Sequence, residues 1–261
     1  MRKKAVLFDL DDTLLWDKRS VKEAFERTCA EAAREANIDA EELERAVRRE
    51  ARVLFEGHEA YPFTQMIGIN PFEGLWAEFR EGRAAEFRLL EMWAPHYRKE
   101  AWTRGLKALG VDDPAMGERL GERFRAHRRS LPYVYEDTFD VLNALKGKVK
   151  LLLLTNGAPD LQKEKLAGVP ELSGYFDHIV ISGDFGRGKP DPAIFRHALS
   201  LLGVPAADAV MIGDKLSTDI LGAGRVGMDS IWINRSSEDV GDGIRPTATV
   251  SRLSEVLRYL E

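Results

Sequence analysis

The 261-residue sequence has little of what marks secreted, disulfide-bonded or membrane proteins. It holds one cysteine, Cys29, which excludes an internal disulfide and a multi-cysteine zinc site and fits a reducing compartment. No stretch approaches the roughly 18 uninterrupted apolar residues of a membrane span. The opening segment MRKKAVLFDLDD becomes charged too early to form the core of a signal peptide. We therefore expect a cytoplasmic protein with no membrane partner.

A basic region is also missing. The formal net charge is −5, and residues 17–135 and the remainder of the chain each hold more acidic than basic residues. The arginine-rich stretch of residues 119–129 is interrupted by Glu122 and preceded by Glu118, and its helical spacing is typical of a solvated helix face. We therefore expect no nucleic-acid partner.

Short apolar runs alternate with helical patterns in both terminal parts of the chain. The runs predict strands at residues 4–10, 149–154, 179–182, 210–212 and 230–233. The helical patterns between them cover about residues 138–146, 192–202 and 217–226. This order predicts an α/β fold in which a parallel sheet has helices on both faces.

Residues 17–135 differ, because helical spacing dominates there. Capping boxes that start at Ser20 and Asp39 predict the beginnings of two helices. Residues 58–74 are rich in Gly, Pro and aromatic side chains and predict a structured loop. We therefore expect an α/β catalytic core of residues 1–16 and 136–261, with an all-helical cap of residues 17–135 inserted into it.

Polar residues follow the predicted strands, at the sheet edge where open α/β folds bind their ligands. They are Asp9, Asp11, Thr155, Asn156, Lys189, Asp214 and Asp219. Carboxylates that meet at one edge repel each other, and they stay ionised together only with a cation between them. Oxygen ligands combined with a substrate phosphate suit Mg²⁺. The sequence thus predicts a Mg²⁺ cofactor and a small phosphorylated metabolite as substrate.

The spacing of two aspartates suits phosphoryl transfer. Asp9 can attack the phosphorus atom and carry the phosphoryl group as an acyl phosphate. Asp11 can protonate the leaving oxygen and then deprotonate the attacking water. Lys189 would offset the charge on the phosphoryl oxygens, and the Thr155 hydroxyl would hold the phosphate.

Four segments, VLFDLDDTL, LLLLTNG, GKPDP and IGDKLSTD, closely resemble the motifs of the haloacid dehalogenase superfamily. The resemblance covers roughly residues 1–16 and 136–261. It implies a Rossmann-like core with a mobile helical cap inserted after the first strand. The sequence is also similar to the branch that contains N-acylneuraminate-9-phosphatase and the pyrimidine nucleotidases, and to a phosphoserine phosphatase type found in bacilli.

The resemblance implies a role for each motif residue. It makes Asp9 the nucleophile and a metal ligand, Asp11 the acid/base and a metal ligand through its backbone, Thr155 and Asn156 phosphate ligands, Lys189 the residue that stabilises the intermediate, Asp214 a metal ligand, and Asp219 either an acid that orients Lys189 or an acid in the outer shell of the metal. One departure is Asp12, where many members of the family have Gly, so the shape of the local turn is in question.

Together these features predict a Mg²⁺-dependent phosphomonoester hydrolase that acts through an aspartyl-phosphate. The resemblance implies that Asp11 separates phosphatases from dehalogenases, which lack this second Asp, whereas mutases share it. Phosphoserine, a sugar phosphate and a nucleoside monophosphate are all candidate substrates. A sugar phosphomutase and a non-catalytic binding or scaffold protein are the alternatives. The sequence predicts neither the cap residues that set specificity nor the oligomeric state.

Overall fold

The computed structural model describes residues 3–237 and 243–260, and the chain divides into two compact units. The first unit comprises Met1–Trp16, Tyr133–Gly157 and Val169–Glu261, and the second comprises Asp17–Pro132 and Ala158–Gly168. A cap of residues 17–135 stays a prediction, since the second unit also contains residues that follow the second strand. No helix among the described residues is both long and apolar enough to cross a membrane.

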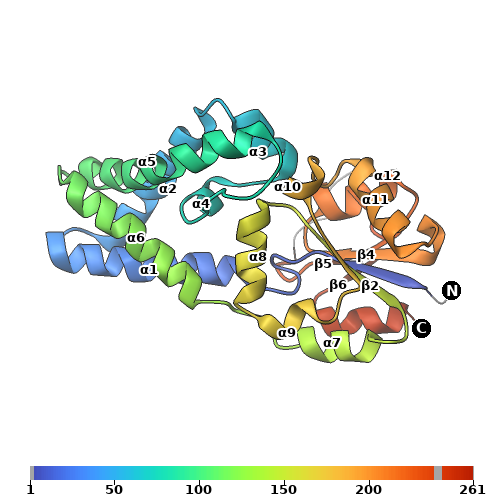
Figure 1. Ribbon diagram of the computed structural model, residues 1–261. Helices are drawn as coiled ribbons and strands as arrows, with labels where there is room; N and C mark the ends of the chain where they lie inside the picture. Colours follow the sequence, from blue (N-terminus) through green and yellow to red (C-terminus); the bar gives the residue numbers. More distant parts are fainter. Residues whose placement is uncertain (1–2, 238–242, 261) are drawn as a thin grey trace. The chain divides into compact units, whose positions relative to one another are not determined.

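The first unit is built on a six-stranded sheet (Figure 1). The strand order is β3-β2-β1-β4-β5-β6, and all five pairings are parallel, which confirms the predicted Rossmann-like α/β fold. The strands are β1 (Ala5–Phe8), β2 (Lys150–Thr155), β3 (His178–Ile181), β4 (Ala209–Gly213), β5 (Asp229–Ile233) and β6 (Ala248–Val250). The sequence had predicted the first five but not β6.

Helices cover both faces of this sheet, with α11 and α12 on one side and α7 on the other (Figure 1). The helices of the first unit are α7 (Thr138–Leu145), α9 (Pro170–Ser173), α10 (Ser182–Phe185), α11 (Pro192–Leu202), the short η1 (Ala206–Asp208), the π-helical η2 (Leu216–Ile220), α12 (Leu221–Arg225) and η3 (Leu253–Tyr259). The alternation of strand and helix in the sequence therefore corresponds to layers in space.

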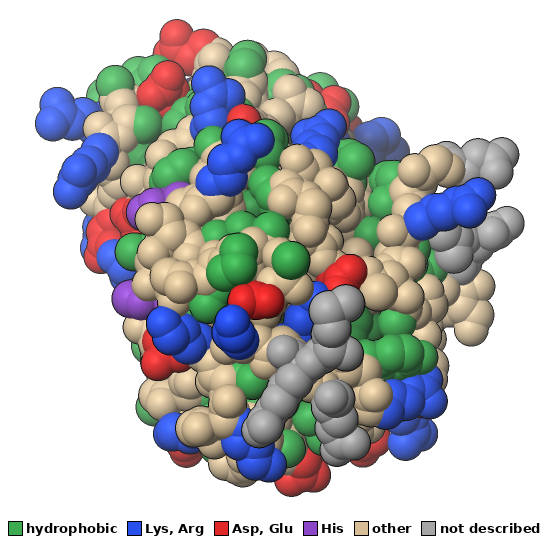
Figure 2. Space-filling view, turned by 90° about the vertical axis from the view of Figure 1, so that its right-hand side faces the viewer, with side chains coloured by type: hydrophobic (Ala, Val, Ile, Leu, Met, Phe, Trp, Pro, Cys, Tyr) green, Lys and Arg blue, Asp and Glu red, His purple; other side chains and the backbone are tan. Residues whose placement is uncertain are grey.

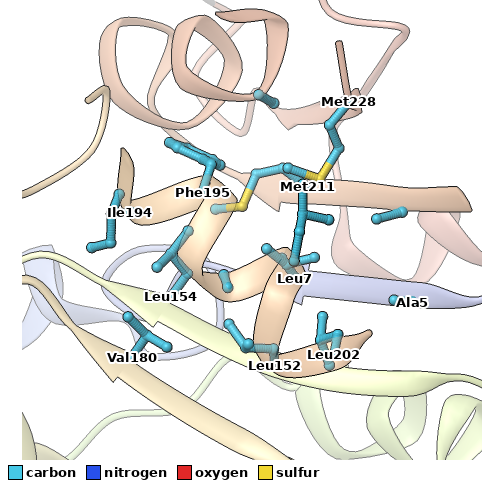
Figure 3. Packing of buried hydrophobic residues seen from close by; sticks show 14 residues of the cluster. Ala5, Leu7, Leu152, Leu154, Val180, Ile194, Phe195, Leu202, Met211 and Met228 are labelled. Carbon is cyan, nitrogen blue, oxygen red and sulfur yellow. The ribbon is translucent and has the colours of Figure 1, made fainter. Parts of the chain in front are cut away.

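The burial of β1 on both faces explains its unbroken apolar sequence, because all four of its residues are buried. On one face Leu7, Leu154 and Met211 pack with Ile194 and Phe195 of α11 (Figure 3). Each fully buried side chain of this size contributes roughly 1.5–3 kcal/mol. The packing of the central strands therefore holds their carboxyl ends firmly in place.

The second unit is helical. It consists of α1 (Asp17–Ala36), α2 (Ala40–Glu56), α3 (Tyr61–Ile67), α4 (Pro71–Gly74), α5 (Ala85–Ala108), α6 (Pro114–Ser130) and α8 (Pro159–Ala167). Residues 58–74, which were expected to form a loop, include α3 and α4. Asn70 caps α4, because its side chain accepts the backbone N–H groups of Phe72 and Glu73.

A buried ionic network joins α8 to other helices of the second unit. The Nζ atom of Lys165 lies 2.9 Å from Oε1 of Glu73 and 3.8 Å from Oδ1 of Asp17. Arg128 near the end of α6 donates to Asp17 at 2.6 Å. Burial acts to raise the pKa of Asp17, but Lys165 and Arg128 outweigh that effect, so its pKa is lowered. The network fixes α8 through charges that are almost completely shielded from water.

The first prediction concerns the stability of this network. Replacing Glu73 by Gln removes the carboxylate charge that lies 2.9 Å from the buried Lys165 ammonium, and we expect a loss of roughly 3 kcal/mol, as for other broken buried pairs. The double change Glu73→Met with Lys165→Met should cost less, because no charge is left unpaired. Calorimetric unfolding measures both effects.

Lys163→Met is the control, because the pair of Lys163 with Glu81 is exposed and is worth no more than about 1 kcal/mol. A Glu73→Gln variant as stable as the Lys163→Met variant would contradict the role of the network.

Candidate active site

The ends of three neighbouring strands bring the predicted site residues to one edge of the sheet. Asp9 follows β1, Thr155 ends β2, and Asp214 follows β4. Because β1 pairs with both β2 and β4 in parallel, their carboxyl ends are adjacent. The backbone N–H of Asp9 also donates to the carbonyl oxygen of Ile212 on β4 at 2.9 Å. The sheet itself therefore positions the central acid.

At this edge one lysine lies between two carboxylates. The Nζ atom of Lys189 lies 2.5 Å from Oδ1 of Asp9 and 2.7 Å from Oδ1 of Asp219. All three residues are buried, with Lys189 only 5% and Asp219 only 1% exposed. Asp219 is held in turn by the backbone N–H of Lys215, which donates to its Oδ2 at 3.1 Å. This arrangement leaves a single positive charge between two negative ones.

The charges of this triad depend on one another. Burial raises the pKa of Asp9 and of Asp219, and Lys189 opposes both shifts. For Lys189, burial acts to lower the pKa, but the two carboxylates outweigh it and raise the pKa above its usual value. Lys189 is therefore positively charged at neutral pH and able to stabilise additional negative charge nearby.

Three carboxylates in this region can together hold a cation. Oxygen atoms of Asp9, Asp214 and Asp219 all lie within 4.8 Å of one another. A set of hard oxygen donors without nitrogen or sulfur fits Mg²⁺, so the residues present suit the predicted ion. The carboxylate of Asp11 is not part of this group; its predicted contribution to the metal site is a backbone oxygen.

Asn156 contacts the backbone of Lys189. Its Nδ2 donates to the carbonyl oxygen of Lys189 at 2.9 Å, and its Oδ1 accepts the N–H of Lys189 at 2.8 Å. The neighbouring Thr155 is 1% exposed, and its hydroxyl donates to the carbonyl oxygen of Asn156 at 3.4 Å. A phosphate-binding role for these two residues stays a prediction, whereas the two hydrogen bonds to Lys189 show that Asn156 holds the backbone of this lysine.

Sequence reasoning missed two glycines that permit these contacts. A Cβ atom on Gly213 would lie 2.3 Å from Oδ2 of Asp219, and one on Gly188 would lie 2.9 Å from Oδ1 of Asn156. Both distances are too short for real Cβ contacts, so the carboxylate and the amide reach their places only beside glycine. The sequence did contain a hint, since each glycine directly precedes a motif residue. However, one sequence alone does not reveal that a side chain from elsewhere in the chain lies against the backbone of that glycine.

The turn after β1 contains Asp12 at the position where many members of the family have Gly. This residue adopts a left-handed conformation with φ of +60°, which explains why glycine suits the position and why Asp tolerates it better than most residues. The N–H of Asp12 donates to the carbonyl oxygen of Leu15 at 2.7 Å. Within the same turn, the hydroxyl of Thr13 donates to Oδ2 of Asp9 at 3.2 Å. The turn therefore forms without glycine and supports the carboxylate of Asp9.

Comparisons with known proteins agree with this geometry. The chain is 34% identical over 253 residues to a phosphoserine phosphatase of Thermus thermophilus, covering 97% of both proteins. It is 33% identical over 187 residues to the pyrimidine 5′-nucleotidase YjjG of Escherichia coli, covering 71% of this chain and 77% of that one. A solved structure of the HAD-hydrolase YfnB of Bacillus subtilis has the same fold, with a TM-score of 0.64 at 23% identity over the whole of both chains.

The family model of the haloacid dehalogenase-like hydrolases matches residues 3–227. That match contains the whole sheet edge described above, from Asp9 to Asp219. The chain therefore belongs to the haloacid dehalogenase-like hydrolases.

Proposed function

We propose that the protein is a Mg²⁺-dependent phosphomonoester hydrolase that works through an aspartyl-phosphate on Asp9. The observation that carries this proposal is the buried Lys189 held between Asp9 and Asp219, with Asp214 close enough to share a cation. Two relatives support the same reaction class. One is named a phosphoserine phosphatase and the other a pyrimidine 5′-nucleotidase, and the chain matches each over most of its length.

In the proposed first step the carboxylate of Asp9 attacks phosphorus and the bond to the leaving oxygen breaks. Asp11 donates a proton to that oxygen, so that the product leaves as a neutral alcohol. Asp11 then takes a proton from water, whose oxygen attacks the acyl phosphate and releases inorganic phosphate and free Asp9. Lys189 offsets negative charge on the phosphoryl oxygens in both steps.

The metal ion has a supporting role in this proposal. The carboxylates of Asp9 and Asp214 and the backbone oxygen of Asp11 would hold Mg²⁺, and the ion supplies positive charge to the phosphoryl oxygens. The ion pair between Asp219 and Lys189, 2.7 Å long, keeps the ammonium in position. Asp219 thus acts through the lysine.

The substrate is a small phosphorylated metabolite. Phosphoserine is the first candidate, because the Thermus relative covers nearly the whole chain, and nucleoside monophosphates and sugar phosphates follow. In the proposed organisation the helical cap of residues 17–135 selects among them.

Phosphate release from a panel of these compounds with Mg²⁺ identifies the class of substrate, and a product analysis separates hydrolysis from isomerisation by a mutase. A wild-type chain that turned over no compound on the panel would favour the scaffold alternative.

The second prediction tests the nucleophile. Asp9→Asn removes the attacking charge and one metal ligand together, so phosphate release should fall by several orders of magnitude while the fold is kept. Chelation of divalent ions should have the same effect on the unmodified protein. Asp12→Asn is the matched control, since Asn also tolerates the left-handed conformation, and it should retain most activity. An Asp9→Asn variant with more than about a tenth of the wild-type kcat would contradict the covalent mechanism.

The third prediction tests the acid. Asp11→Asn should lose most turnover on alkyl phosphates, whose leaving groups need a proton. It should lose much less on p-nitrophenyl phosphate, whose leaving group departs without one. Steady-state kinetics on both substrates measure the difference, and equal losses would count against the acid role.

The fourth prediction concerns the space beside Asp219. Gly213→Ala would push the Asp219 carboxylate away from Lys189, so kcat should fall roughly tenfold to a hundredfold. This loss is smaller than the one expected if the positive charge of Lys189 were removed altogether. KM should change little, because the displaced group does not touch the substrate. Gly224→Ala is the control, since nothing lies within 4 Å of its added Cβ atom. The same kcat in both variants would show that Asp219 does not position the lysine.

A further inference from the structure

The first unit contains a second site at the opposite edge of its sheet. A cavity of about 730 Å³ is lined by residues at the beginnings of β1, β2 and β3. Lys4 immediately precedes β1, Lys150 begins β2, and Asp177 immediately precedes β3. The catalytic residues lie where the same strands end. Since β2 has six residues, the two edges are separated by roughly 20 Å along that strand.

Positive charge is concentrated in this cavity. Its lining includes one acidic residue, Asp177, and five lysines, which are Lys3, Lys4, Lys146, Lys148 and Lys150. The surrounding chain has the opposite balance, with a formal net charge of −5. Figure 2 faces the side of the molecule that includes the chain start, and lysine and arginine side chains (blue) lie at several places on it. Lysines this close to each other repel, so an anion in the cavity would relieve the repulsion.

Only part of this charge is neutralised by the protein. Lys3 pairs with Asp229 at 2.6 Å and Lys4 with Asp208 at 2.8 Å. Lys146 and Lys150 instead donate to backbone carbonyl oxygens, those of Gly174 at 3.1 Å and Leu202 at 2.5 Å.

Among residues 3–237 and 243–260, no carboxylate pairs with Lys146, Lys148 or Lys150. Gly147, with φ of +76°, turns the chain between α7 and β2, so that these three lysines are presented along one short segment. The positive charges of these three ammonium groups are therefore not neutralised by a carboxylate of the described residues.

The remaining wall is apolar and held rigidly. Tyr175 and Phe176 line the cavity together with Val149. The Tyr175 hydroxyl donates to Asn143 at 2.9 Å, and the Nζ atom of Lys146 lies 4.7 Å from its ring. Phe176 packs edge-on against Phe8, with ring centroids 6.4 Å apart. A cavity that combines fixed aromatic rings with lysines favours a ligand that has both a ring system and negative charge.

We infer that this cavity binds a small organic polyphosphate of the nucleoside diphosphate type, at a site separate from the catalytic one. The volume is typical of sites for small ligands and far exceeds that of a single phosphate ion. Each phosphate group carries between one and two negative charges, so two of them match the three unpaired lysines. The phosphates lie against Lys146, Lys148 and Lys150, and the base lies on the side of Tyr175 and Phe176.

The test uses calorimetric titration of the full chain with adenosine 5′-(α,β-methylene)diphosphate, whose bridging carbon resists hydrolysis. The buffer contains no divalent cations and little salt. The double variant Lys146→Glu with Lys148→Glu should weaken binding tenfold or more, the scale of one or two lost charge-assisted contacts. The control Lys22→Glu with Lys107→Glu changes the net charge equally at exposed positions and should alter the Kd less than twofold.

Two further measurements show whether the loss of binding arises in the cavity itself. Lys148→Glu alone should also weaken binding, and it breaks no bond within the described residues. Hydrolysis of p-nitrophenyl phosphate with Mg²⁺ should be the same in the cavity variants and the wild type, because the catalytic edge is untouched. Equal affinity of the probe for the wild type and the Lys146, Lys148 variant would overturn the inference.

Competing ligands test the chemistry of the site. Adenosine alone should not bind, and tripolyphosphate should bind more weakly than the nucleotide probe. Tripolyphosphate that bound as tightly as the probe would show that the aromatic wall plays no part and would overturn the proposed ligand class. A single-stranded oligonucleotide that bound more tightly than the probe would show a nucleic-acid surface instead of a small-ligand site.

Discussion

The burial of Lys189 between Asp9 and Asp219 is the constraint on which the catalytic edge depends. Without the ammonium group, the carboxylates of Asp9, Asp214 and Asp219 would repel one another, with at most a metal ion to offset their charge. The lysine is stable in this buried position because its ammonium group forms ion pairs with two carboxylates. Its backbone also forms two hydrogen bonds with the side-chain amide of Asn156. Asp9, Lys189 and Asp219 are therefore one electrostatic unit.

The sequence predicted the positions of the strands well and the supporting contacts poorly. Runs such as residues 149–154 identify a strand because both of its faces are buried, whereas β6, with only three residues, is too short to give a pattern. The motif aspartates could be assigned to one edge because parallel strands end together. The bonds from Asn156 to Lys189 and the space beside Gly213 could not be predicted, since they depend on residues far apart in the sequence that meet only in the folded chain.

The assignment of α8 shows a similar limit. Its position after β2 suggested that residues 158–168 belong to the catalytic core, but Lys165 makes its ion pairs with Glu73 and Asp17 of the second unit. In this division the chain passes between the units at four points. One of these points, between Gly157 and Ala158, directly follows Thr155 and Asn156. The helix that carries Lys165 thus begins two residues after Gly157, close in sequence to Asn156, which holds the backbone of Lys189.

The two edges of the sheet carry opposite charge. Because they lie far apart, the charges at each edge are offset only by groups close to that edge. The lysines at the beginnings of β1 and β2 are roughly 20 Å along the strand from the aspartates at the ends, well beyond the screening length of about 8 Å at physiological salt. They cannot offset the repulsion among Asp9, Asp214 and Asp219, which Lys189 offsets from within the site and which the proposed Mg²⁺ would reduce further. By the same argument the aspartates leave the lysine-lined cavity positive, so the proposed anionic ligand there and the proposed phosphorylated substrate at the other edge would be recognised by independent sets of charges.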